Sequence, residues 1–322
     1  MSKKNRPRGY PADPTPALPV PVVDTHTHLD SDASGWLPGP DKPLIHDDAD
    51  PWKWDANNAP TVDAQIARAA AAGVDRMVQV GCDLPSARWT ADIVTQHPAL
   101  VGAVALHPNE APMHAGTHDV GPDGLEPAAR DHYAVPLDEA IAEIAALAAS
   151  SSRIRAIGET GMDLFRCGPQ GAHTQRESFR AHIAIAKELD LALQIHDRDA
   201  HAEVLDILQR DGAPARTVFH CFSGDVEMAR LCASKGWFLS FAGPITYPAN
   251  QHLRDALVET PLDLLLAETD APYLAPAPYR GQPNAPYVVA HTVRAMAEIR
   301  LAPLEDLCQA LSRNSERAFG QW

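Results

Sequence analysis

The chain has 322 residues, of which 45% are hydrophobic and 21% are charged, and its formal net charge at pH 7 is −15. This composition is typical of a globular protein with a sizeable core, and it excludes global disorder and a general basic face for nucleic acid. No run approaches the ~20 apolar residues of a membrane span, and prolines follow the basic segment Met1–Arg8 where a signal peptide would be apolar. The five cysteines are odd in number and show no CxxC spacing, which argues against a disulfide framework and indicates a cytoplasmic protein.

Short apolar runs alternate with helical patterns along the chain. The runs that predict strands are Val20–Asp24, Arg76–Gly81, Leu100–His107, Ile154–Glu159, Leu191–His196, Thr217–His220, Trp237–Ala242 and Leu264–Asp270. The segments that predict helices are Thr61–Ala72, Ser86–Gln96, Leu137–Ala149, Gln175–Leu189, Asp199–Arg210, Asp225–Lys235, Asn250–Glu259, Tyr287–Arg300 and a closing Leu304–Phe319. Eight consecutive strand–helix units with doubly buried strands predict an α/β fold, a closed (β/α)8 TIM barrel. A doubly wound open sheet is the alternative.

A barrel of this kind takes about 250 residues, so roughly 70 residues are extra. Residues 1–18 are rich in Pro, Arg and Lys and are predicted to form a disordered tail before a single domain at 19–322. Two insertions, 31–60 and 113–135, follow strand ends and are expected to overhang the catalytic face. The second contains His114, His118 and His132, for which two interpretations stay open, an accessory metal site and a solvated loop.

Chemically active side chains stand at the ends of the predicted strands. They are His26, His28, Glu159, His196, His220 and Asp270. Because the carboxyl ends of barrel strands converge, these side chains are expected to meet there as ligands of two divalent metal ions. Imidazole and carboxylate ligands without thiolate suit ions such as Mg, Mn or Zn. Cys221 is interpreted as a buried apolar residue outside the site.

Two of these residues are candidates for catalysis as well as for metal binding. Glu159 can bridge two ions through its two oxygens. Asp270 can either bind a metal or take a proton from the attacking water as general base. The alternative for Asp270 is a helix N-cap before Ala271 and Pro272.

Eight motifs occur in a fixed order through the chain. They are DTHTHLD (24–30), ALHPNE (105–110), GETGMD (158–163), QRESF (175–179), IHDRDA (195–200), HCFSG (220–224), FAGPITY (241–247) and ETDAPYLAP with RGQPN (268–276 and 280–284). This series resembles the TatD family of metal-dependent deoxyribonucleases within the amidohydrolase superfamily. The resemblance implies that His26, His28 and Asp270 hold one metal, that His196 and His220 hold the second, and that Glu159 bridges them. It also implies that His107 contacts substrate or supports the ligands.

We therefore expect a divalent-metal-dependent phosphodiesterase, specifically a 3′–5′ exonuclease on single-stranded DNA, with Arg198 and Arg280 as phosphate-binding residues. Alternatively, either arginine pairs with neighbouring acids such as Asp197 or Asp199. The two ions would supply positive charge that the acidic chain lacks, which favours DNA ends or small phosphodiesters as substrates. Two alternatives remain: hydrolysis of another ester or an amide, such as an aminoacyl ester or a cyclic amide, and a non-catalytic scaffold.

Overall fold

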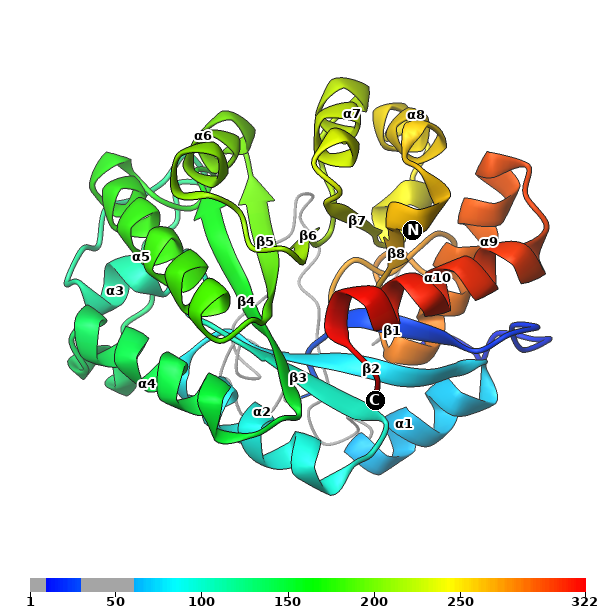
Figure 1. Cartoon of the computed structure of the whole chain (residues 1–322), viewed down its shortest axis with the longest axis horizontal. Coiled ribbons are helices and arrows are strands. Elements are labelled where there is room, and N and C mark those ends of the chain that lie inside the picture. The colour runs from blue at the N-terminus through cyan, green and yellow to red at the C-terminus, as the bar shows by residue number, and fades with distance from the viewer. Residues whose placement is uncertain (1–9, 30–60) are drawn as a thin grey trace, which may run out of the picture.

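Eight parallel strands form one sheet in the order β1 to β8, and helices surround it (Figure 1). The structure is a computed structural model that describes residues 10–29 and 61–322. The strands are β1 (Val22–Thr27), β2 (Val74–Gly81), β3 (Leu100–Val104), β4 (Ile154–Asp163), β5 (Ala192–Arg198), β6 (Thr217–Phe219), β7 (Phe238–Phe241) and β8 (Leu265–Ala267). A parallel bridge between Thr27 and Ala271 joins the two edges of the sheet. The predicted (β/α)8 TIM barrel is confirmed.

The helices follow the predicted segments except that α3 was not predicted and α5 begins six residues before the predicted start at Gln175. They are α1 (Val62–Ala71), α2 (Leu84–Gln96), α3 (Ala111–His114), α4 (Leu137–Ser150), α5 (Pro169–Glu188), α6 (His201–Asp211), α7 (Val226–Ser234), α8 (Gln251–Glu259), α9 (Val289–Arg300) and α10 (Leu304–Phe319). Side chains fix several of their starts: Asp83 accepts a hydrogen bond from the backbone N–H of Ser86 at α2, and Asp225 does the same for Met228 at α7.

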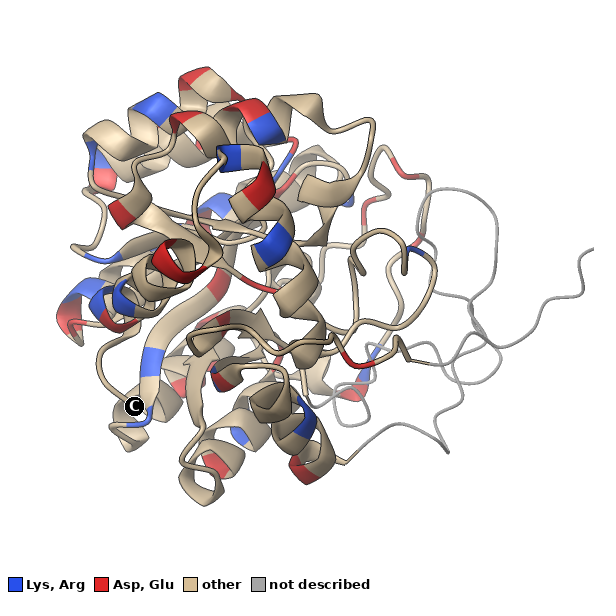
Figure 2. Ribbon diagram, turned by 90° about the vertical axis from the view of Figure 1, so that its right-hand side faces the viewer, with Lys and Arg blue, Asp and Glu red and all other residues tan. Residues whose placement is uncertain are grey.

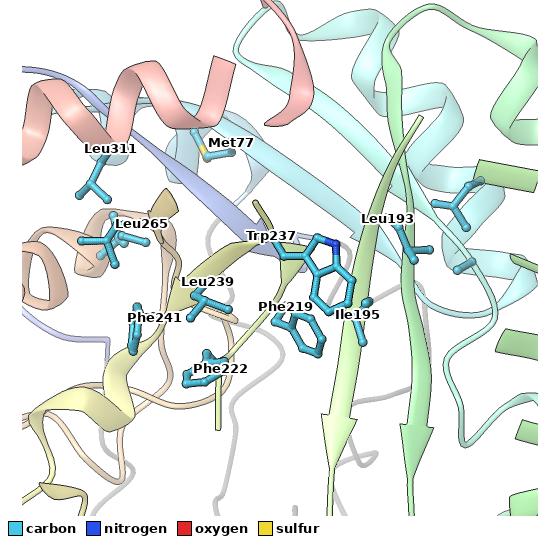
Figure 3. Packing of buried hydrophobic residues seen from close by; sticks show 14 of the residues in the cluster. Met77, Leu193, Ile195, Phe219, Phe222, Trp237, Leu239, Phe241, Leu265 and Leu311 are labelled. Atoms are coloured by element: carbon cyan, nitrogen blue, oxygen red, sulfur yellow. The ribbon is translucent and has the colours of Figure 1, made fainter. Parts of the chain in front are cut away.

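Two layers of buried side chains hold the barrel together. The outer layer joins strands to helices and includes Met77, Leu193, Phe219 and Leu311 (Figure 3). Alternate strand residues point to opposite faces, so the neighbours of these residues fill the barrel interior. The inner cluster comes mostly from strands, and its members are Val78, Val80, Cys82, Val101, Ala103, Ala156, Ala192, Val218, Phe238, Leu264, Leu266, Ala318 and Phe319. The interior is therefore a packed core below the site.

The polar residues of the barrel continue the inward-facing rows of this inner cluster. Cys82 lies two residues beyond Val80, His220 two residues beyond Val218, and Glu268 two residues beyond Leu266. The period of two in an extended strand keeps each of them on the inner face. The same alternation that builds the core therefore places polar groups at its carboxyl end.

The predicted disorder of residues 1–18 is wrong for the part that the structure describes. Leu18 is buried against the core, and its N–H donates to the carbonyl of Ala72 at 3.0 Å. The Tyr287 hydroxyl donates to the carbonyl of Pro11 at 2.6 Å, and Asp13 pairs with Arg68 at 2.7 Å. These apolar and ionic contacts offset the chain entropy lost in ordering the segment. Residues 1–9 and the insertion 31–60 lie outside the described residues.

Charges of both signs are interspersed over the helices in the view of Figure 2. Many of them pair, as Arg88 does with Glu143 and Arg230 with Glu259. Within residues 10–29 and 61–322, every helix is too short or too polar to cross a membrane. Because charges of both signs are mixed on this surface, attraction of an anionic substrate would have to come from the site itself.

Candidate metal centre

The six predicted ligands converge at the carboxyl end of the barrel. We call this group the Glu159 centre; its members are His26, His28, Glu159, His196, His220 and Asp270. They come from β1, β4 and β5 and from the residues that follow β1, β6 and β8. His26 is fully buried, while the side chains of His28 and Asp270 keep 14% exposure. His196 keeps 18% exposure, so the centre is mostly buried and three of its side chains remain partly exposed.

One oxygen of Glu159 faces His26 of β1 and His28, which follows this strand. Oε1 lies 3.6 Å from His26 Nε2 and 3.7 Å from His28 Nε2. The carboxylate of Asp270 closes this group, with Oδ1 at 3.8 Å from His26 Nε2 and 3.4 Å from His28 Nε2. The two Nε2 atoms are themselves 3.2 Å apart. Two imidazole nitrogens and two carboxylate oxygens therefore surround one small space.

The other oxygen of Glu159 faces a different pair of histidines. Oε2 lies 2.7 Å from His220 Nε2 and 2.9 Å from His196 Nδ1. His107 Nε2 stands farther away, at 3.8 Å from the same oxygen and 3.3 Å from His196 Nδ1. The Glu159 carboxylate thus separates two sets of nitrogen ligands, one on each oxygen.

Hydrogen bonds behind the rings decide which nitrogens can bind a cation. His28 Nδ1 lies 3.0 Å from the carbonyl of Val80 and must donate to it, which leaves Nε2 as the lone-pair nitrogen of the neutral ring. His220 Nδ1 lies 3.2 Å from Glu268 Oε1, so its Nε2 faces Glu159 in the same way. Oriented histidines of this kind are the usual arrangement around a protein-bound metal. The residues present therefore fit divalent cations.

The protonation states of the centre support this fit. Burial alone would lower the pKa of His220, but Glu159 and Glu268 hold it well above its usual value. Burial alone would raise the pKa of Glu159, but His220, His107 and His196 hold it well below its usual value. Without metal, a proton on His220 thus balances the Glu159 carboxylate. Metal binding displaces such protons, because a ligating histidine must be neutral.

Asp270 owes its position to the backbone around it. Its φ is 55°, in the left-handed region, and its N–H donates to the carbonyl of His26 at 2.9 Å. Next to it, the hydroxyl of Thr269 donates to the buried carboxylate of Asp24 at 2.6 Å. Burial opposes the charged form of Asp270, but His28, His26 and His220 outweigh it and lower its pKa. Asp270 is therefore an ionised carboxylate at neutral pH, as a ligand or a general base must be.

Three residues of the site were missed by the sequence reasoning. Asp163 Oδ2 lies 3.3 Å from His196 Nε2, and Glu268 supports His220. The thiol of Cys82 donates to Glu159 Oε1 at 3.3 Å. Asp163 and Glu268 stand inside quoted motifs, GETGMD and ETDAPYLAP, and Cys82 directly follows β2. Their strand-end positions were the signal that could have revealed them.

The predicted phosphate-binding arginines contact aromatic rings. The guanidinium of Arg198 lies 4.1 Å from the ring centre of Phe165, and that of Arg280 lies 4.8 Å from the ring centre of Tyr247. Asp197 pairs with His201 at 2.8 Å, which leaves the alternative pairing of Arg198 with this acid unsupported. Stacking on an aromatic ring orients a guanidinium without neutralising it. Phosphate binding by these two residues stays a prediction.

Comparisons with known proteins identify the family of the chain. The family model described as TatD related DNase matches residues 23–320. The "uncharacterized metal-dependent hydrolase TatD" of Mycobacterium tuberculosis is 39% identical over 303 residues, which are 93% of this chain and 98% of that protein. The "uncharacterized metal-dependent hydrolase YabD" of Bacillus subtilis is 33% identical over 255 residues, or 79% and 91% of the two chains.

A solved structure adds the fold to this evidence. YJJV, a TatD homologue from Escherichia coli, matches with a TM-score of 0.72 and 26% identity, over 94% of this chain and 98% of that one. The residues that the family model matches, 23–320, run through all the strands that carry the Glu159 centre. The chain belongs to the TatD family of metal-dependent hydrolases.

Proposed function

We propose that this protein is a phosphodiesterase that uses two divalent cations, Mg, Mn or Zn, to remove nucleotides from the 3′ ends of single-stranded DNA. The observation that carries the proposal is the division of the Glu159 carboxylate between two groups of histidines. A carboxylate with ligands on both oxygens is suited to bridging two ions. Membership of the family described as TatD related DNase supports the choice of substrate.

Residues in and around the Glu159 centre have distinct roles in this reaction. When bound, the two cations would activate a water molecule and neutralise charge on the phosphoryl oxygens. Asp270 holds that water and accepts its proton on a carboxylate oxygen, for which its lowered pKa keeps it ionised. Glu268 and Asp163 keep His220 and His196 in place. Arg198 and Arg280 would bind phosphates of the substrate next to the scissile bond.

The charge of the chain restricts the substrate. The net charge of −15, and the mixing of both signs over the helices in the view of Figure 2, disfavour binding along a long duplex. A strand end needs only a few local contacts and the charge of the bound cations. This favours DNA ends and small phosphodiesters over internal sites of long DNA.

Hydrolysis of another ester or an amide is the second candidate. It rests on the fold, since one barrel with the same metals serves many reactions and the pocket decides among them. A non-catalytic scaffold is a weaker candidate, because the Glu159 centre has all six predicted ligands and its Asp270 is ionised.

The test uses single-stranded DNA labelled at its 5′ end. Protein stripped with chelator and reloaded with Mg or Mn should shorten the strand stepwise from the 3′ end. Asp270→Asn should lower the rate about 10²- to 10⁴-fold, the usual contribution of a general base. Asp306→Asn, an exposed position in α10, is the matched control and should act like the wild type. Intact DNA together with cleavage of carboxylic esters or amides would establish the second candidate.

A further inference from the structure

A second group of ligating side chains lies in the insertion 113–135 and just before it. We call it the second histidine cluster; its members are Glu110, His114 and His132. Glu110 immediately precedes α3, His114 is the last residue of α3, and His132 lies in a short 3-10 helix at Asp131–Ala134. One ligating atom from each of the three lies within 4.8 Å of the other two. The cluster thus joins the two ends of the insertion.

His114 is oriented as a metal-binding histidine is. Its Nδ1 lies 2.8 Å from the carbonyl of Val135 and must donate to it, so its Nε2 carries the lone pair. The residue is only 5% exposed, and among the described residues Nε2 has no hydrogen-bond partner. A buried lone pair without a donor is costly, and a cation placed there would satisfy it.

The other two members face each other. His132 Nε2 lies 3.0 Å from Glu110 Oε2, a spacing compatible with two ligands of one small ion. The second oxygen of Glu110 accepts a hydrogen bond from the Tyr133 hydroxyl at 2.9 Å, which orients the carboxylate. Glu110 is 3% exposed. An ion pair between Glu110 and His132 alone would leave the lone pair of His114 Nε2 without a partner. One ion bound by all three side chains accounts for the positions of all of them.

We propose that Glu110, His114 and His132 bind one divalent transition-metal ion of the zinc class, at a site separate from the Glu159 centre. Two histidines and one glutamate form a ligand set that zinc commonly accepts, with a water in the fourth position. An open cavity of about 420 Å³ reaches His114, one of the three ligands, and Met113, Arg130 and Tyr133 also line it. The ion would fasten both ends of the insertion 113–135.

The site is connected to the Glu159 centre through the backbone. The N–H of Glu110 donates to the carbonyl of His107 at 2.9 Å, and His107 contacts His196 of the Glu159 centre. The ion would therefore hold the insertion at a fixed place beside the catalytic end of the barrel. The proposal does not depend on the reaction catalysed there.

The first experiment counts bound zinc on chelator-stripped, full-length protein by metal analysis after equilibration and gel filtration. The wild type should retain one more equivalent of zinc than His132→Gln. His118→Gln is the matched control, because this exposed histidine lies in the same insertion but outside the cluster, and it should retain the wild-type number. Equal zinc contents of the wild type and a folded His132→Gln protein would overturn the proposal.

The second experiment needs no variant, so a misfolded mutant cannot leave the question open. Crystals of wild-type protein soaked with zinc should give an anomalous peak at the zinc edge between Glu110, His114 and His132. A peak at the Glu159 centre with none at the second histidine cluster would overturn the proposal. Crystals of Asp270→Asn protein, soaked in the same way, should keep the peak at the second histidine cluster. The two proposals are thus tested separately, because this variant lacks the proposed general base but keeps all three ligands of the cluster.

Discussion

Glu268 Oε1 lies 3.2 Å from His220 Nδ1, on the side of the imidazole opposite Glu159. Glu268 is completely buried, and its Oε1 also accepts the backbone N–H of Cys221 at 2.7 Å. A carboxylate in this position fixes the tautomer of His220 and raises its basicity as a ligand. Glu268 is therefore a positioning residue, which acts on the metal centre through His220.

Replacement of Glu268 by glutamine should weaken metal binding without removing any ligand. The amide oxygen of Glu268→Gln can still accept from His220, but the negative charge is lost. We expect the metal concentration for half-maximal activity to rise about 10- to 100-fold, with kcat recovered at saturating metal. Glu298→Gln, exposed on α9, is the control. An unchanged metal titration of Glu268→Gln would contradict this role.

Replacement of Glu159 tests whether its two oxygens act separately. Glu159→Gln keeps one oxygen ligand and replaces the other with an amide nitrogen, which cannot bind a cation. We expect the protein to lose at least one bound metal equivalent and about 10²-fold or more in kcat. Metal analysis and turnover measured on the same preparation check both effects. Full metal content with normal kcat would show that Glu159 does not bridge.

The two arginines are tested through substrate binding. If Arg198 donates to a phosphate, Arg198→Gln should raise KM about tenfold, the loss expected for one charge-assisted hydrogen bond of about 1.5 kcal/mol. Arg198→Lys should recover part of the loss, because it keeps the charge but not the planar donor group. The same substitutions apply to Arg280. Arg210 is an exposed residue of α6, and Arg210→Gln is the control that should leave KM unchanged. An unchanged KM for Arg198→Gln would show that Arg198 does not contact a phosphate.

Stability at acidic pH should depend on His182 in α5. Its Nδ1 donates to the carbonyl of Ser178 at 2.7 Å and its Nε2 accepts from the N–H of Leu106 at 3.2 Å, which holds the ring neutral. Burial lowers the pKa of His182 from 6.5 to about 4. The unfolded chain takes up this proton below pH 6.5 and the folded chain does not, so stability falls between pH 6.5 and 4 by about 3 kcal/mol.

The measurement compares the free energy of unfolding across this pH range in three proteins. His182→Gln, whose amide can replace both hydrogen bonds without titrating, should lose about 3 kcal/mol less than the wild type between pH 6.5 and 4. His173→Gln, exposed on the same helix, should follow the wild type. Parallel curves for the wild type and His182→Gln would show that His182 titrates normally.

The fold and the meeting of the six predicted ligands follow from the sequence because they depend on two features of the strands. Apolar strands recur regularly, and polar residues stand at their carboxyl ends. The end of β4 did not follow this logic: the prediction stopped at Glu159, but the strand continues to Asp163. Gly161, a usual sign of a turn, instead permits a close approach, since a Cβ there would lie 2.1 Å from the carbonyl oxygen of His196. Asp163 was therefore missed as a partner of His196.

The prediction of disorder for the N-terminal segment was wrong for a different reason. Its proline and charge content is typical of disorder, but Leu18 and Pro11 find partners on the barrel that lie far away in the sequence, at Ala72 and Tyr287. Composition measures what a segment can do alone, whereas these contacts depend on a surface that only the folded barrel provides. The support of His220 by Glu268 was missed likewise, because it joins two strands that are separated by 48 residues.

In three strands the inward-facing row changes from an apolar to a polar residue in a single step, from Val80 to Cys82, from Val218 to His220 and from Leu266 to Glu268. In these three rows the residues below the step are apolar and carry the packing, while those above it carry the polar groups of the site. Evolution can therefore exchange the uppermost layer for a different substrate while the layers beneath continue to fold the protein.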